Sequence, residues 1–333
     1  MVNNTLTNIL ITGGAGFIGY FIAKKLSDDA NNQIHLFDNF SRGQQDPELR
    51  ELEERANVTL IRGDLTRSDD VSQLGTDYHY VYHLAAVIGV QNVMENPDKV
   101  LYVNATSTLL LFEHLKKCTQ IKRVLFSSTS EIYAGTLKHF DIPVPTPETV
   151  ALTLDDIGSN RTTYMLSKMY GESIAHMYGK MHAIPYTIVR YHNVYGPRMG
   201  FKHVIPEMFI KLTSQERVEI ASPEHTRAFC FVDDAVNMTI AAVESAEGAN
   251  QTFHIGNSDE EIKIRDLIGT IAQTVSADVE LRDGEEHPGS PARRCPDISH
   301  FLSQIGYSQF TSLEEGIKKS WDWYATRLEN RHE

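Results

Sequence analysis

A tyrosine and a lysine four residues apart are the first pair in this chain that could do chemistry. Tyr164 and Lys168 stand as Y-x-x-x-K, and this spacing places both side chains on one face of a helix. An ammonium group there favours the phenolate and lowers the pKa of the phenol, which would make Tyr164 a usable base near neutral pH. Such pairs are commonplace on exposed helices, but Thr129, which follows the apolar run 124–126, makes a functional interpretation the better one.

A glycine-rich turn indicates a second chemistry, the binding of a diphosphate. The segment 12–19, Thr-Gly-Gly-Ala-Gly-Phe-Ile-Gly, follows an apolar run at 8–11 and precedes a helix-like segment at 20–26. Glycine lets backbone N–H groups approach a diphosphate without a Cβ in the way, and the dipole of the following helix favours the anion. A strand, a glycine turn and a helix therefore predict a pyrophosphate site.

Two carboxylates downstream extend this prediction to a dinucleotide. Asp38 closes the next apolar run about as far along as expected for a carboxylate that binds the adenosine ribose, which favours NAD over NADP. Arg42 keeps NADP open, because a guanidinium at this place could meet a 2′-phosphate. Asp64 follows the apolar run 58–61, where a short acidic turn either meets the adenine or is simply solvated.

With these motifs the chain resembles the extended short-chain dehydrogenase/reductase family, and within it the nucleotide-sugar branch of epimerases, dehydratases and decarboxylases. The resemblance covers nearly the whole chain, and it includes the segments 83–86, 127–133, 190–197 and 226–229. It implies NAD as cofactor and a nucleotide sugar as substrate. The cofactor contacts that it implies are Gly13, Gly16, Phe17, Ile18, Asp38, Asn39, Ser41, Asp64, Leu65, Leu84, Ala85, Ala86, Tyr164 and Lys168.

The same resemblance implies a shared first step and three possible outcomes. Tyr164 would take the proton of a sugar hydroxyl while Thr129 holds the oxygen, and NAD would accept a hydride. The resulting 4-keto sugar is then reduced on its other face by an epimerase, loses carbon dioxide from C6 in a decarboxylase, or loses water in a dehydratase. Only the last two reactions need further acid–base groups.

The residues after Thr129 bear on this choice. Thr129-Ser130-Glu131 resembles the Thr-Ser-Glu signature of UDP-glucuronate decarboxylases, whereas the 4,6-dehydratases typically carry Thr-Asp-Glu. Serine cannot replace the aspartic acid that delivers a proton to a departing C6 hydroxyl. Glu131 is common to both classes; it could manage the proton at C5, or point to solvent.

Arginines supply the expected contacts to the substrate. Arg161 lies three residues before Tyr164, where its planar fork could grip a sugar carboxylate or pair with an acidic residue of the preceding loop. By resemblance, Arg227 and Arg294 bring cations to the diphosphate or to the reacting carboxylate, and Asn193 helps to hold the diphosphate. The expected catalytic residues are thus Thr129, Glu131, Tyr164, Lys168 and Arg294, and the expected substrate-binding residues are Ser130, Arg161, Asn193, Arg227 and Arg294.

Some segments depart from the decarboxylase pattern. Tyr133 is followed by Ala134-Gly135 rather than directly by glycine, and the segments 87–92 and 190–193 look more epimerase-like. We therefore expect a decarboxylase of a nucleotide-linked uronic acid, with a 4-epimerase as the alternative and a dehydratase third. A catalytically silent NAD-binding regulator is a further alternative, although such proteins commonly lose the tyrosine or the lysine.

Short β-rich runs alternate with helical patterns up to about residue 187, which predicts an α/β fold with a doubly wound, Rossmann-type parallel sheet. The expected strands are 8–12, 33–38, 57–62, 80–84, 122–127 and 185–190, and the expected helices include 99–117 and 161–181. Beyond residue 190 short elements are punctuated by proline and glycine, as in a smaller, interleaved substrate domain. The proline-rich, acidic insert 134–160 is expected to form a loop over the mouth of the site.

The expected organisation in domains and subunits rests on the resemblance. It implies an NAD-binding domain at 1–187 plus 229–257, and a nucleotide-sugar domain at 188–228 and 258–333. It also implies that the helices at 99–117 and 161–181 pair across a two-fold axis as a four-helix bundle, giving a homodimer. Simple packing of both helices against the sheet is the alternative.

Composition narrows the class of protein. The 333 residues are 41% hydrophobic, enough for a large core, and the net charge of −13 argues against nucleic acid and anionic membranes as partners. Three scattered cysteines give neither a disulfide framework nor zinc spacing, so we expect a reducing cytoplasm. The histidines show no ligand spacing, so no metal is expected. Residues 1–7 are polar and no apolar run approaches ~20 residues, so we expect neither a signal peptide nor a membrane-spanning helix.

Overall fold

The computed structural model of this protein describes residues 6–43, 45–286 and 291–329. The chain divides into two units. Unit 1 comprises the described residues up to Ile132, together with Thr153–Arg190 and Met238–Phe253. Unit 2 comprises Tyr133–Leu152, Tyr191–Asn237 and the described residues from His254 onwards.

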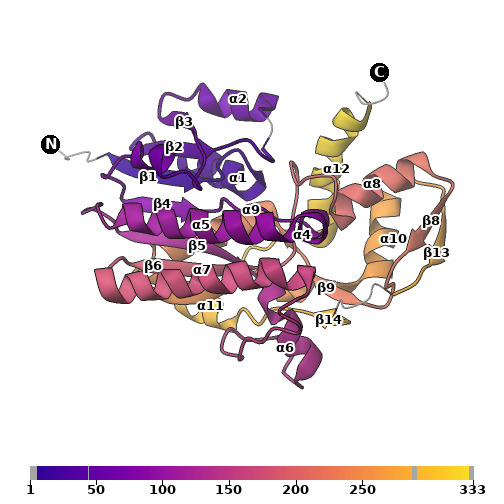
Figure 1. Ribbon diagram of the computed structural model, residues 1–333. Coiled ribbons are helices and arrows are strands. Elements are labelled where there is room, and N and C mark those ends of the chain that lie inside the picture. Colours follow the sequence, from indigo (N-terminus) through magenta and orange to yellow (C-terminus); the bar gives the residue numbers. More distant parts are fainter. Residues whose placement is uncertain (1–5, 44, 287–290, 330–333) are drawn as a thin grey trace. The chain divides into compact units, whose positions relative to one another are not determined.

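A seven-stranded sheet in the order β11-β6-β5-β4-β1-β2-β3 is the frame of unit 1 (Figure 1). Its strands are β1 (Thr7–Thr12), β2 (Asn32–Asp38), β3 (Val58–Arg62), β4 (Tyr80–His83), β5 (Arg123–Thr129), β6 (Tyr186–Tyr191) and β11 (Gln251–Ile255). β1 pairs in parallel with both β2 and β4, and the next pairs outwards, β2 with β3 and β4 with β5, are parallel as well. The predicted Rossmann-type fold is confirmed.

Helices cover this sheet. They are α1 (Phe17–Leu26), α2 (Pro47–Glu53), α3 (Ser68–Ser72), α4 (Val90–Glu95), α5 (Pro97–Leu115) and α7 (Asn160–His182), and α9 (Val232–Glu244) leads into β11. α5 and α7 lie side by side, and Leu111 and Phe112 of α5 share a core cluster with Ile174 of α7 and Val124 of β5 (Figure 1). Continuous apolar runs form the central strands because both faces of a parallel sheet are buried.

Local signals explain where several of these helices begin and end. Asp46 caps α2 by accepting a hydrogen bond from the N–H of Leu49 at 2.9 Å, and Pro47 stands at the first helical position, where its missing N–H does no harm. α7 ends at His182, and its C-cap residue Ala183 takes a left-handed conformation with φ of 54°. None of the helices in the described part of the chain is both long and apolar enough to cross a membrane.

Unit 2 is built from short strands and helices. Its small sheets have the orders β12-β9-β14, β13-β8 and β10-β7. The strands are β7 (Val194–Tyr195), β8 (Arg217–Ile220), β9 (Thr226–Ala228), β10 (Cys230–Phe231), β12 (Glu261–Lys263), β13 (Glu280–Asp283) and β14 (Arg293–Arg294). The helices are α6 (Ala134–His139), α8 (Val204–Ser214), α10 (Ile264–Thr274), α11 (Ser299–Gln304) and α12 (Leu313–Glu329).

The insert 134–160 differs from its expectation as a loop. Its first six residues form α6, which continues the 3-10 turn η1 (Ser130–Tyr133). Gly135 and Thr136 are buried, and the Thr136 hydroxyl donates a hydrogen bond of 2.8 Å to the carbonyl of Ala151. This anchorage stabilises a helical turn that the proline-rich composition of the insert does not indicate.

Candidate active site

The carboxyl ends of five neighbouring strands carry most of the residues that the sequence singles out. β1 leads into the glycine turn, β2 ends at Asp38, β3 leads to Asp64, β4 leads to Leu84 and β5 ends at Thr129. Because these strands are parallel, all five ends lie at one edge of the sheet. That edge is where open α/β sheets bind their ligands.

The glycine turn is held against the loop after β4. Gly13 has a φ of +73°, and its N–H donates to the carbonyl of Phe37 at 2.8 Å. A Cβ at Gly13 would lie 2.8 Å from the nitrogen of Ala85, and a Cβ at Gly19 would lie 2.3 Å from the carbonyl oxygen of Gly13. Side chains are therefore excluded at both positions, and the turn keeps its backbone close to the start of α1.

The N-terminus of α1 is suited to an anion. Gly16 occupies the N-cap position without a side-chain cap, and the first turn, which includes Phe17 and Ile18, carries no acidic residue. The first N–H groups of a helix have no intrahelical partner, and the dipole places partial positive charge there. Nothing in the first turn competes with a bound anion for these groups.

Asp38 is fixed by backbone groups. One carboxylate oxygen accepts from the N–H of Ala15 at 3.0 Å and the other from the N–H of Phe40 at 2.8 Å. Burial raises the pKa of Asp38, and these two hydrogen bonds oppose the rise. Two carboxylate oxygens offer about four acceptor positions, so Asp38 keeps capacity for two hydroxyl groups.

Asp64 belongs to a second fixed turn, connected to the first. Its carboxylate accepts from the N–H and hydroxyl of Thr66 at 2.8 and 2.7 Å and from the side-chain amide of Asn39 at 3.1 Å. Asn39 in turn accepts from the N–H of Ser41 at 3.0 Å, and Leu65 is buried. Burial raises the pKa of Asp64, but these hydrogen bonds outweigh it and leave the pKa lowered.

A buried asparagine that the sequence analysis did not single out organises the loop after Leu84, Ala85 and Ala86. Asn104 of α5 accepts from the N–H of Val87 at 2.7 Å and donates to its carbonyl at 3.0 Å. The same amide donates to the hydroxyl of Ser167 on α7 at 3.1 Å. Asn104 thus ties the loop to the helix that carries Tyr164. The only sequence signal for this role is that Asn104 is a polar residue within the apolar pattern of a helix.

Thr129 and Tyr164 meet at the end of β5. Their hydroxyl groups share a hydrogen bond, and the N–H of Glu131 donates to the Thr129 hydroxyl at 3.2 Å. Thr129 is thereby placed between the phenol and the turn η1, which carries the buried Ser130 and the half-buried Glu131.

The expected lowering of the Tyr164 pKa is not found in the protein chain itself. Burial raises the pKa of the phenol and the charge of Glu131 raises it further, while the hydrogen bond with Thr129 and the charge of Arg42 lower it less. The reason is geometric, because the Lys168 ammonium donates to the carbonyl of Ser127 at 2.7 Å and lies 5.9 Å from the centre of the Tyr164 ring.

Lys168 is buried among groups of unit 1. Its Nζ lies 5.2 Å from the centre of the Phe126 ring, and burial lowers its pKa to about 8, against the opposing charge of Glu172. His83 is buried as well, between the hydroxyls of Thr12 at 2.8 Å and Thr108 at 3.0 Å. Burial, helped by the charge of Lys168, lowers the pKa of His83 to about 3, so this imidazole is neutral.

Two arginines of unit 1 lie at the periphery of this group. Arg161 is exposed in the first turn of α7, one turn before Tyr164. Arg42 lies in the loop after β2, yet its charge acts on the Tyr164 phenol, and burial lowers the pKa of its guanidinium. From the sequence, the only partner expected for Arg42 is a 2′-phosphate.

The remaining three predicted residues belong to unit 2. Arg227 and Arg294 are neighbours in the parallel pairing of β9 with β14, and Arg294 is buried. Asn193 has a φ of 37° and donates from its side chain to the carbonyl of Ala228 at 2.9 Å. Unit 2 therefore brings the two arginines together on adjacent strands.

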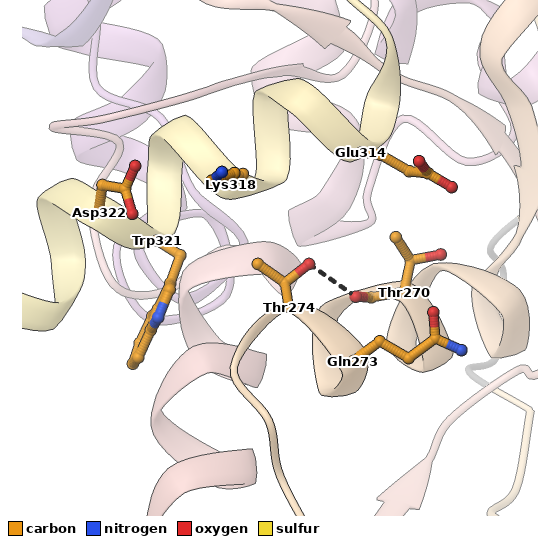
Figure 2. A pocket seen from close by; sticks show the side chains of 7 residues that line it. All are labelled: Thr270, Gln273, Thr274, Glu314, Lys318, Trp321 and Asp322. Carbon is orange, nitrogen blue, oxygen red and sulfur yellow. Dashed lines mark hydrogen bonds between the residues drawn. The ribbon is translucent and has the colours of Figure 1, made fainter.

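No group of three or more histidine, cysteine, aspartate or glutamate side chains in the described residues could hold a metal ion. A hollow of about 570 Å³ lies between α10 and α12 of unit 2, and the side chains that line it are shown in Figure 2. It is lined by Thr270, Gln273, Thr274, Glu314, Lys318, Trp321 and Asp322. None of these is a residue that the sequence analysis singled out.

Comparisons with known proteins give the context of this geometry. The family described as "NAD dependent epimerase/dehydratase family" matches residues 9–256. UDP-glucuronic acid decarboxylase 6 of Arabidopsis thaliana is 30% identical over 96% of this chain and 89% of its own length. The UDP-glucose 4-epimerase of Thermotoga maritima, solved with UDP-glucose, is 27% identical with a TM-score of 0.84, covering 97% of this chain and 100% of that one. The UDP-glucuronic acid 4-epimerase of Bacillus cereus, solved with UDP-glucuronic acid and NAD, is 26% identical with a TM-score of 0.81, covering 96% and 100%.

Proposed function

This chain belongs to the NAD dependent epimerase/dehydratase family, and we propose that within it the protein decarboxylates UDP-glucuronate to UDP-xylose. The family acts on nucleotide sugars and includes decarboxylases, epimerases and dehydratases. The observation that carries the proposal is the turn η1, where Ser130 and Glu131 directly follow Thr129, the hydrogen-bond partner of Tyr164.

NAD is the cofactor, and the residues of unit 1 fit it. The turn at Gly13 and the uncapped start of α1 suit a diphosphate, and Asp38 retains acceptor positions for the hydroxyls of a ribose. When bound, NAD supplies a hydride acceptor and a positive charge.

Three residues would act at C4 of the sugar, Tyr164 as the base, Thr129 as a hydrogen-bond donor and Lys168 as a positive charge. Thr129 donates a hydrogen bond to the Tyr164 oxygen, and Tyr164 removes the proton of the C4 hydroxyl. The Lys168 ammonium, held by Ser127, stabilises negative charge that develops on the phenol. Because burial and Glu131 both raise the pKa of Tyr164, this positive charge is needed for the phenolate to form.

Decarboxylation needs more than these three residues. With a ketone at C4, the C5–C6 bond breaks, carbon dioxide leaves, and the electron pair passes into the enolate at C4 and C5. A proton must then be added at C5, and the C4 ketone must regain the hydride and a proton to give UDP-xylose. Glu131 lies close enough to Tyr164 to act on its pKa, and we assign the C5 proton to this carboxyl group.

Ser130 argues against dehydration. A dehydratase must protonate a departing C6 hydroxyl, and serine is too weak an acid for this step. For Arg161 we propose a contact to the substrate carboxylate, since it lies one helical turn from Tyr164. For Arg227, Arg294 and Asn193 the proposed contacts to the diphosphate and the reacting carboxylate rest on the sequence motifs that carry them.

A UDP-glucuronate 4-epimerase is the second candidate. It is favoured by the segments 87–92 and 190–193 and by the similarity to the Bacillus cereus enzyme. An epimerase does not touch C5, so it has no use for a carboxyl group at residue 131.

Variants of Glu131 and Arg294 test the proposal. We expect Glu131→Gln and Arg294→Ala, given UDP-glucuronate, to reduce NAD while forming little UDP-xylose, because oxidation at C4 precedes the step they serve. Glu314→Gln, which changes an exposed carboxylate of α12, is the control and should form UDP-xylose at the native rate. Full UDP-xylose formation by Glu131→Gln would remove Glu131 from the mechanism.

A further inference from the structure

A buried ion pair lies behind the lysine of the active site. Tyr164, Lys168 and Glu172 follow one another at intervals of four along α7, so they share one helical face. The guanidinium of Arg190, on β6, donates to both oxygens of Glu172, at 2.9 Å from Nε and 2.7 Å from Nη2. Both side chains are almost inaccessible, with exposed fractions of 7% and 6%.

Stability of the fold is a weak reason for such a pair. Removing two charges from water is costly, and a well-packed apolar pair of similar volume is often at least as stable. The position of the pair suggests another reason. Glu172 is one helical turn from Lys168, and its charge opposes the effect of burial on that lysine.

The other groups around Lys168 do not supply a negative charge. Ser127 of β5 offers a carbonyl oxygen, Phe126 a ring face, and His83 of β4 a neutral imidazole. On α7 itself, Tyr164 is protonated because its pKa is raised. Among the residues that the structure describes, Lys168 makes no ion pair. Glu172 therefore acts on the ammonium through the buried space between two turns of the helix.

We propose that Glu172, held in place by Arg190, is a positioning residue that keeps Lys168 in the ammonium form during the reaction. The inference rests on the role proposed for Lys168, which is common to decarboxylation, epimerisation and dehydration. Arg190 fixes the Glu172 carboxylate by two hydrogen bonds. Its positive charge also limits how far the carboxylate raises the proton affinity of Lys168. Glu172 touches neither the phenol nor the carbonyl of Ser127, so it acts only through Lys168.

The test is a titration of Lys168 in the NAD-loaded protein. Lysine labelled with carbon-13 at Cε reports protonation by NMR, and the signal of Lys168 is identified by its loss in Lys168→Arg. We expect Glu172→Gln to lower the midpoint by about one pH unit or more, a tenfold loss of proton affinity, because the carboxylate is gone while Arg190 remains. Glu113→Gln, which changes a carboxylate of α5, should leave the midpoint unchanged.

A double variant separates charge from packing. In Glu172→Gln/Arg190→Gln both charges are gone, so the midpoint should fall less than in Glu172→Gln alone. Equal falls in the two variants, or a native midpoint in Glu172→Gln, would overturn the proposal. If Glu172→Gln does not fold, the double variant is compared with the native protein. A Lys168 midpoint that is lower by about half a pH unit or more supports an effect of the Glu172 charge on Lys168, and an unchanged midpoint refutes it.

The titration uses no sugar substrate, so it tests the role of Glu172 even if UDP-glucuronate is not the substrate. With whichever nucleotide sugar reacts, the alkaline limb of the turnover profile should move to lower pH in Glu172→Gln by the same amount as the midpoint. A loss of packing alone would lower turnover at every pH without moving that limb.

Discussion

Replacing Gly13 by alanine tests how closely the glycine turn must approach the loop after β4. The φ of +73° is unfavourable for any residue with a Cβ, by about 1–2 kcal/mol. The new Cβ would also lie 2.8 Å from the nitrogen and 3.0 Å from the Cα of Ala85, which are backbone atoms that cannot rotate away. Overpacking of this kind typically adds about 1–3 kcal/mol. We therefore expect Gly13→Ala to lower the free energy of unfolding by about 2–5 kcal/mol.

The same displacement should weaken the cofactor. The turn and the Ala85 loop must move apart, so we expect the Kd for NAD to rise about tenfold or more, which is at least ~1.4 kcal/mol. Urea unfolding and calorimetric titration with NAD measure the two effects. Gly306→Ala is the matched control, because Gly306 also has a positive φ, of +81°, but its Cβ would meet no atom within 4 Å.

The control should lose only the conformational part, about 1–2 kcal/mol, and bind NAD as the native protein does. The reasoning is refuted if Gly13→Ala is no less stable than Gly306→Ala and binds NAD with native affinity. In that case the close approach of the turn to Ala85 would not matter for the cofactor.

Three further predictions concern the cofactor, the base and the oligomeric state. Asp38→Ala should reduce the preference for NAD over NADP, measured as the ratio of the two Kd values, and equal affinity of the native protein for both cofactors would contradict the role of Asp38. Tyr164→Phe should lower turnover by roughly 10²–10⁴-fold while the urea midpoint changes little, since only one hydrogen bond to Thr129 is lost; near-native turnover would rule out the shared first step. Met177→Asp places a charge on α7 where the native side chain is 51% exposed, and we expect it to dissociate the proposed homodimer, as measured by sedimentation. A native protein that sediments as a monomer would contradict the four-helix-bundle interface.

Much of the frame of unit 1 was predictable from the sequence because periodicity and turn chemistry agree there. The apolar runs that predict strands at 8–12 and 33–38 form β1 and β2, and the helix expected at 161–181 is α7, Asn160–His182. Strands of a parallel sheet are buried on both faces and therefore form continuous apolar runs, so they can be predicted with little knowledge of the tertiary structure. The short helix α6 was not predicted, because a contact of Thr136 with Ala151 stabilises it.

The site was less predictable, because its electrostatics depend on distances between elements. The spacing of Tyr164 and Lys168 predicts one helical face, but not that the ammonium donates to the carbonyl of Ser127, or that burial and the charge of Glu131 raise the pKa of the phenol. The pairing of Glu172 with Arg190 joins a helix to a strand, and the link of Asn104 to Val87 joins a helix to a loop. Neither contact has a local sequence signal beyond a polar residue in an apolar pattern.

The most direct test of the proposed decarboxylation is one product analysis in heavy water. The native protein, loaded with NAD, is incubated with UDP-glucuronate, and the product is examined by mass spectrometry and NMR. We predict UDP-xylose, lighter than the substrate by carbon dioxide and carrying one deuterium at C5, because a solvent-derived proton must be added there. A 4-epimer with unchanged mass and no deuterium at C5 would contradict decarboxylation and leave the 4-epimerase as the function of this protein.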